Sequence, residues 1–146
     1  RPFAALAAGF VGDRFGGVKI IMLCFIGMIF GDLVIAFGLI GPNALWLLFM
    51  NVVISSVAVF GVRGLYFAIF DDAGVPDHLT GTAVGLVSVI GYTPDIFMGP
   101  INGYLTDTYT GATGHQYFFA VLAGFATLGL ISTIGFKRLS VSRRTV

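Results

Sequence analysis

Four long apolar stretches dominate this sequence and limit what it can fold into. They cover residues 20–40, 44–68, 80–106 and 117–136, and none contains more than one charged residue. A helix needs about 20 mostly apolar residues to cross a bilayer, and each stretch reaches that length. Only 10% of the residues are charged, whereas a typical soluble domain has about 25%. The sequence therefore predicts an integral membrane protein with an all-α fold, a polytopic bundle of transmembrane helices.

A shorter apolar run, residues 1–11, precedes these four stretches. It has about half the length of a span, so we expect four complete spans plus part of a fifth, in a piece of a longer protein. The connections are short and rich in turn-forming residues, which makes neighbouring helices antiparallel. Residues 1–146 are expected to form a single membrane domain that ends in a cytoplasmic tail at residues 137–146.

The positions of Lys and Arg predict the orientation. Basic residues lie in the first connection, near the end of the second complete span and after the last span. The connections at residues 41–43 and 107–116 contain neither Lys nor Arg. On an antiparallel path all basic segments then fall on one side, which the positive-inside rule makes cytoplasmic. We expect a plasma (inner) membrane protein with its C-terminus in the cytoplasm.

Glycines spaced by four residues occur inside three of the spans. Small residues one turn apart allow helix backbones to approach closely in lipid, so these pairs favour a tightly packed bundle. The pairs are Gly27 and Gly31, Gly81 and Gly85, and Gly99 and Gly103.

The composition argues against several other classes of protein. The net charge is only +1, so no basic surface points to nucleic acid. Cys24 is the single cysteine, which excludes an internal disulfide and a thiolate cluster. His78 and His115 are predicted on opposite membrane faces, and no Ser-His-Asp set or phosphate-binding glycine loop occurs. We therefore expect no enzyme activity, no cofactor and no metal.

A polar, glycine-rich loop, GFVGDRFGGVK at residues 9–19, separates the first apolar run from the second. It closely resembles the loop signature of the major facilitator superfamily: a glycine, then Asp-Arg, an aromatic residue, a glycine and a basic residue. In that superfamily of twelve spans the signature lies between spans two and three and, in weaker form, between spans eight and nine. Four complete spans follow the loop here. The resemblance therefore implies a C-terminal half, from the end of span eight through span twelve.

Membership of that superfamily would imply a secondary active transporter, a symporter or antiporter, working by rocker-switch alternating access. Its partners would be a small polar solute, H⁺ or Na⁺, membrane lipid and the missing N-terminal helices of the same protein. The phrase GYTPDIFMGPINGYLTD, with Arg1 and Arg63, favours an organic anion or a sugar derivative. The main alternative is an integral-membrane enzyme or assembly subunit without transport activity.

The loop residues are expected to act in gating or structure rather than in binding solute. Gly12 and Gly16 permit a tight reversal, while Arg14 and Lys19 hold the loop in the headgroup layer. Asp13 is placed to favour the positive end of a neighbouring helix.

By the same resemblance, Asp13 and Arg63 form a cytoplasmic latch that holds when the inner gate is shut. The alternative is that both residues only cap helices and face lipid headgroups.

The middle of the span at residues 80–106 supplies the first candidates for binding a solute or coupling ion. Gly91 and Pro94 weaken the helix there, and Pro94 leaves a carbonyl without its usual donor. Transporters place binding sites beside such breaks. The alternative is a structural kink with Asp95 in an outer vestibule. The candidates from this span are Tyr92, Thr93, Asp95 and Asn102.

Three further polar residues are candidates because of their expected depth. Arg1 lies about 15 Å from the inner face if residue 11 ends a span, so it could bind an anionic solute or be only a terminus. Asp32 is near the middle of its span, where it either pairs inside the bundle or carries a proton; a coupling role is the third possibility. Asn51, with Ser55 and Ser56, either lines the cavity or holds helices together.

Overall fold

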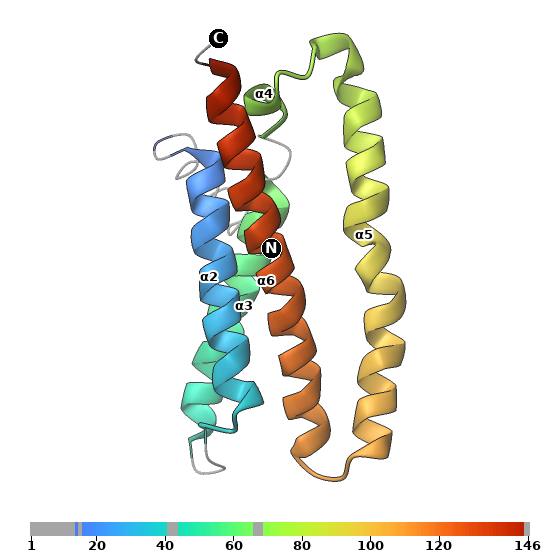
Figure 1. Cartoon of the computed structure of the whole chain (residues 1–146). Coiled ribbons are helices and arrows are strands. Elements are labelled where there is room, and N and C mark those ends of the chain that lie inside the picture. The colour runs from blue at the N-terminus through green and yellow to red at the C-terminus, as the bar shows by residue number, and fades with distance from the viewer. Residues whose placement is uncertain (1–13, 15, 41–43, 66–68, 145–146) are drawn as a thin grey trace.

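The computed structural model describes residues 14, 16–40, 44–65 and 69–144, and every regular element in them is a helix. Four long helices are present: α2 (Gly17–Ala36), α3 (Leu45–Leu65), α5 (Asp77–Thr108) and α6 (Thr113–Arg144). A short helix, α4 (Ile69–Ala73), lies between α3 and α5 (Figure 1). The prediction of an all-α bundle with four complete spans is confirmed, because all four long helices are long and apolar enough to cross a membrane. The expected fifth span, at residues 1–11, lies outside the described residues.

The last two helices are longer than the sequence analysis predicted. α5 is one continuous 32-residue helix that passes through Pro94 and Pro100, so the expected break at Pro94 is not seen. α6 begins at Thr113, before the predicted start at residue 117, and continues to Arg144. The predicted tail is therefore helical as far as Arg144, since Lys and Arg end the lipid-embedded part of a helix but are themselves good helix formers.

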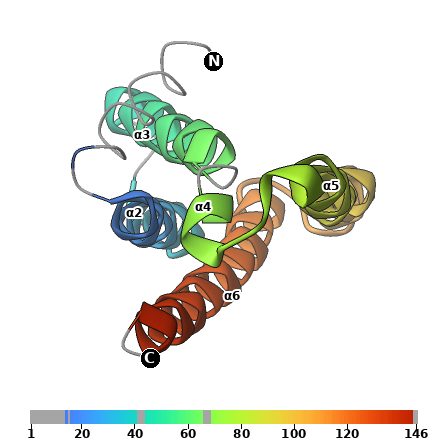
Figure 2. The same cartoon turned by 90° about the horizontal axis from the view of Figure 1, so that it is seen from above.

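α2 packs against both α3 and α6, whereas α5 packs principally against α6. Seen from above, α5 stands apart from α2 and α3 (Figure 2). Two glycines make the close approaches around α2. The ring of Phe25 in α2 occupies the space that a Cβ atom at Gly129 in α6 would need. A Cβ at Gly31 would come within 2.7 Å of Asn51 Oδ1 and 2.8 Å of Ser55 Oγ, so α3 lies close against the backbone of α2.

The other glycines of the predicted packing pairs do not make such contacts. Among the described residues no atom outside their own helical backbone would lie within 4 Å of a Cβ at these positions. Glycine spacing alone thus identified the one close approach at Gly31 but overestimated the rest. The glycines without such a contact are Gly27, Gly81, Gly85, Gly99 and Gly103.

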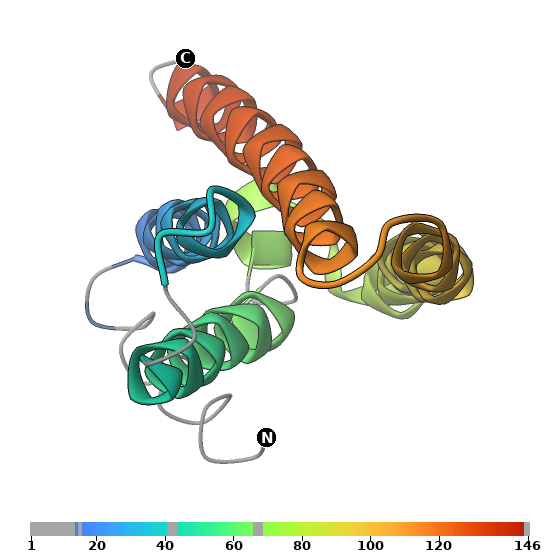
Figure 3. The same ribbon diagram turned by 90° about the horizontal axis from the view of Figure 1, so that it is seen from below.

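Residues 109–112 join α5 to α6 in a tight turn, visible at the near end of the molecule in Figure 3. Gly111 has a φ of 73°, a left-handed conformation that favours glycine. A Cβ at Gly114 would lie 2.7 Å from the carbonyl oxygen of Leu105 and 2.9 Å from the Cα of Thr106. The rings of Tyr109 and Tyr117 then pack edge to face, with centroids 4.7 Å apart.

The helices bury few side chains against one another and expose many large apolar ones. The exposed side chains include Phe30, Leu45 and Ile96. In water such a surface would associate, whereas lipid tails solvate it. This distribution is that of an integral membrane protein. The buried apolar residues are Ile21, Ala58, Leu65, Ala123 and Ala126.

We expect Gly114→Ala to destabilise the protein by about 2 kcal/mol, because the new methyl group would overlap fixed backbone atoms of the turn. Gly124→Ala is the matched control in the same helix, since a Cβ there meets no described atom within 4 Å. Thermal unfolding of the purified protein in detergent measures both effects. Equal melting temperatures for the two variants would contradict the close packing at Gly114.

Candidate functional site

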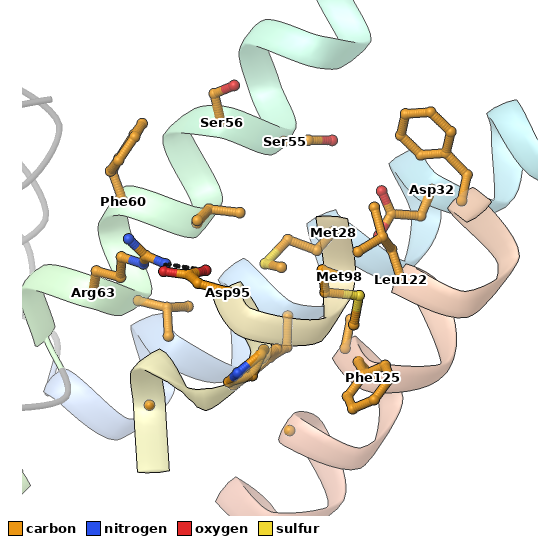
Figure 4. Close-up of a pocket in the computed structure, with 18 of the residues that line it drawn as sticks. Met28, Asp32, Ser55, Ser56, Phe60, Arg63, Asp95, Met98, Leu122 and Phe125 are labelled. Atoms are coloured by element: carbon orange, nitrogen blue, oxygen red, sulfur yellow. Dashed lines mark hydrogen bonds and ion pairs between the residues drawn. The ribbon is translucent and has the colours of Figure 1, made fainter. Parts of the chain in front are cut away.

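A cavity of about 770 Å³ lies between α2, α3, α5 and α6. Its walls are mostly apolar, and its polar groups come from three helices: Asp32 from α2, Ser55, Ser56 and Arg63 from α3, and Asp95 from α5. Figure 4 shows these side chains around the cavity together with Met28, Met98 and Phe125. A mainly apolar cavity with a few convergent polar groups is the usual form of a small-molecule site.

An ion pair joins α3 to α5 at one wall of this cavity. One guanidinium nitrogen of Arg63 lies 3.2 Å from each carboxylate oxygen of Asp95 and donates to both. The same guanidinium lies over the ring of Tyr92, with its carbon 5.3 Å from the ring centroid, a distance at which a cation is attracted to the π face. Tyr92, Asp95 and Arg63 therefore form one cluster, which we call the Arg63 cluster.

The Arg63 cluster lies at the middle of α5. Arg63 is two residues before the end of α3 at Leu65 (65 − 63), whereas Asp95 is 18 residues after Asp77, the start of α5 (95 − 77). Eighteen helical residues correspond to about 27 Å. Counting along α3 had placed Arg63 near the inner face. α3 instead ends beside the middle of α5, with α4 and the first turns of α5 beyond it (Figure 1).

Asp32 lies across the cavity from the Arg63 cluster (Figure 4). Its side chain is only 5% exposed, and none of the described residues forms a hydrogen bond or ion pair with it. At its neighbour Gly31, side chains of α3 lie close against the backbone of α2. The expectation of a pairing partner for Asp32 inside the bundle is thus unmet among the described residues.

Asn51 holds α2 and α3 together. Its amide nitrogen donates to the carbonyl oxygen of Gly31 at 2.8 Å, and Asn51 does not line the cavity. Of the two roles left open by the sequence, this geometry favours helix–helix contact. Ser55 and Ser56, one turn further along α3, do line the cavity.

Two other candidates on α5 lie outside the cavity lining. The hydroxyl of Thr93 donates to the carbonyl oxygen of Val89 at 2.7 Å, so it is already used within its own helix. The side-chain oxygen of Asn102 is buried and has no hydrogen-bond partner among the described residues. Neither residue belongs to the Arg63 cluster.

The loop candidates are described only in part. Gly16 has a φ of 91° and precedes the first residue of α2, which agrees with its expected role in a reversal. Arg14 and Lys19 are exposed. Arg1, Gly12 and Asp13 lie outside the described residues, so the latch between Asp13 and Arg63 stays a prediction. Asp95 is a partner of Arg63 that the sequence analysis did not assign to it.

The sequence carried a signal for this pairing. Arg63 and Asp95 are each the only charge in an apolar span, and charges inside a membrane usually pair with one another. The apolar wall from α6, which includes Phe119, Leu122 and Phe125, had no comparable signal. Among the described residues no three His, Cys, Asp or Glu side chains are arranged to hold a metal ion.

Two curated proteins of Escherichia coli (strain K12) are similar to this chain. The inner membrane protein YqcE is 39% identical over 77 residues, which cover 53% of this chain and 18% of that protein. The inner membrane protein YihN is 34% identical over 87 residues, which cover 59% of this chain and 21% of that protein. The aligned part of this chain thus spans about a fifth of the length of these relatives. No family model and no solved structure matches the chain.

These comparisons correct the family assignment. The resemblance of the loop at residues 9–19 implied a major facilitator half, but no family model matches and the relatives are named only as inner membrane proteins. A loop of glycines, Asp and Arg has a sufficient local cause, because a tight turn at a membrane surface requires flexible backbone and charges that face headgroups. Together with the four apolar helices, the comparisons support the coarser class, an integral inner membrane protein.

The Arg63–Asp95 ion pair can be tested by a double-mutant cycle. We expect Arg63→Gln and Asp95→Asn each to destabilise the protein, since each leaves the other charge in an apolar span without its partner. The double variant should lose less than the sum of the two single losses, with a coupling of about 1 kcal/mol. Reversible unfolding in mixed micelles measures the cycle, and Asp107→Asn, an exposed carboxylate on the same helix, is the control. Strict additivity would show that the contact contributes nothing.

Proposed function

We propose that this protein translocates a small polar solute across the membrane and that the cavity between the four long helices binds it. The observation that carries this proposal is the Arg63 cluster, which puts an ion pair on the wall of a cavity at the middle of a 32-residue membrane helix. Ionisable groups at such a depth are costly and usually mark a substrate or ion pathway.

The packing of α5 suggests how access to the cavity changes. α5 packs against α6 and meets α3 through the Arg63–Asp95 pair. A solute group that displaces one member of the pair removes that link, and α5 can then move relative to α3. In this proposal Ser55 and Ser56 provide hydrogen bonds to the solute, and the coupling ion is H⁺ or Na⁺. Activity requires the remaining helices of the same protein.

This proposal assigns no enzyme activity. The alternative is an integral-membrane enzyme or assembly subunit. Such a protein does not require its cavity to open first to one membrane face and then to the other. Access to the cavity from each side therefore separates the two functions.

We also propose that the C-terminus is cytoplasmic, because Lys137 and Arg138 lie at the exposed end of α6 and basic residues are retained inside the cell. Alkaline phosphatase fused after Gly111, in the turn between α5 and α6, should be active, since the enzyme requires the periplasm. The same fusion after Arg144 should be inactive. Equal activity at both positions would contradict this topology.

Transport predicts that a cysteine in the cavity is reached from both membrane faces. In a Cys24→Ser background, Ser55→Cys of the complete protein should react with the membrane-impermeant cation 2-(trimethylammonium)ethyl methanethiosulfonate in spheroplasts and in inside-out vesicles. Val57→Cys is the matched control, because Val57 is exposed on the same helix but does not line the cavity. Labelling of Ser55→Cys from one face only, or from neither, would contradict alternating access.

A further inference from the structure

The cavity contains one carboxyl group that has no partner in the Arg63 cluster. Its ionisable lining residues are Asp32, Arg63 and Asp95, and Arg63 is already paired with Asp95. Asp32 remains, buried and without a hydrogen-bond or ion-pair partner among the described residues. A carboxylate in this position is penalised by its loss of water and is stabilised by any cation that reaches it.

The surroundings of Asp32 restrict the kind of cation. The α2 and α6 wall of the same cavity includes Phe25 and Met28 of α2 and Phe119, Leu122 and Phe125 of α6. Aromatic faces attract organic cations, and thioether side chains such as Met28 adapt to irregular apolar shapes. A small hydrated metal ion would gain little from such a wall, because it requires several oxygen ligands. An organic cation with an apolar body uses both the carboxylate and the wall.

We propose that Asp32 binds the positively charged group of an organic cation whose apolar, preferably aromatic, body packs against the α2 and α6 wall of the cavity. This inference rests on the proposed function in that the same cavity is the solute site. It specifies the solute as a cation with an apolar body, in place of a small polar solute such as the expected organic anion or sugar derivative. That expectation used Arg1, which lies outside the described residues, and Arg63, which Asp95 neutralises.

The probe for this site is tetraphenylphosphonium, a permanent aromatic cation, and its control is tetraphenylborate, an anion of nearly the same shape. Equilibrium dialysis of the complete protein in detergent measures binding of labelled tetraphenylphosphonium. We expect saturable binding that unlabelled tetraphenylphosphonium abolishes, whereas labelled tetraphenylborate, dialysed alone in a separate experiment, should show no saturable binding. This comparison uses the unmodified protein and so does not depend on the folding of any variant.

Substitutions then locate the charge that is responsible. Asp32→Asn should weaken tetraphenylphosphonium binding by about tenfold or more, since it removes the buried charge with little change of shape. Asp32→Glu, which keeps the charge, should weaken it less. Asp107→Asn, an exposed carboxylate of α5 outside the cavity, should leave binding unchanged. Equal affinity in Asp32→Asn and the unmodified protein, or equally tight saturable binding of tetraphenylborate dialysed alone, would overturn the proposal.

The two proposals fail in different ways. If tetraphenylphosphonium binding depends on Asp32 but Ser55→Cys is not labelled from both faces, the cation site stands and transport is rejected. If Ser55→Cys is labelled from both faces but tetraphenylphosphonium binding does not depend on Asp32, transport stands and the cation site is rejected.

Discussion

The ion pair between Arg63 and Asp95 joins α3 to α5, and each of these residues is the only charge in its apolar span, residues 44–68 and 80–106. α5 packs mainly on α6, and the Arg63–Asp95 ion pair links it to α3. The side chains of Arg63 and Asp95 are 42% and 60% exposed on the surface of the bundle, so in a bilayer their pairing lowers the cost of placing either charge among lipid tails. Arg63 and Asp95 both belong to the cavity wall, and apolar side chains form most of the remaining lining. The contact that joins α3 to α5 is thus also part of the cavity.

A second contact fixes the opposite side of the cavity. The amide of Asn51 bonds to the carbonyl of Gly31, and the absence of a side chain at Gly31 lets α3 approach α2. Asp32 follows Gly31 directly in the chain, and Ser55 lies one turn beyond Asn51. The contact between Asn51 and Gly31 therefore sets the positions of two polar groups at the cavity. Hydroxyls elsewhere, such as those of Thr93 and Thr133, are bonded within their own helices. They satisfy backbone carbonyls rather than forming part of the site.

The four membrane helices could be predicted from sequence because apolar length is a local property of each segment. The extent of α6 could not be predicted in the same way, because Lys137 and Arg138 end only the apolar part of the helix and not the helix itself. The contact between Arg63 and Asp95 was missed for a different reason. Depth was counted separately in each span, on the assumption that neighbouring helices start at one level, and α3 in fact ends beside the middle of α5.

The side chains at residues 88–100 were recognised only in part. Tyr92 and Asp95 were correctly placed near one another because they lie on one helix, three residues apart. The role of Thr93 was not predictable from its type, since its hydroxyl could face the cavity or its own backbone, and only the helix geometry decides. The partner of Asn51 is 20 residues away in another helix, a relation that a single sequence without homologues does not contain.

The length of α6 links this bundle to the thickness of its bilayer. Its apolar part, Thr113–Leu139, has 27 residues and measures about 40 Å, more than the hydrocarbon core of about 30 Å. The helix crosses the bundle obliquely in Figures 2 and 3, as expected when surplus length is accommodated by tilting. A thicker membrane would favour a more upright α6, and α5, anchored to it, would swing with it. Lipid composition would thereby adjust how wide the space beside Asp32 opens.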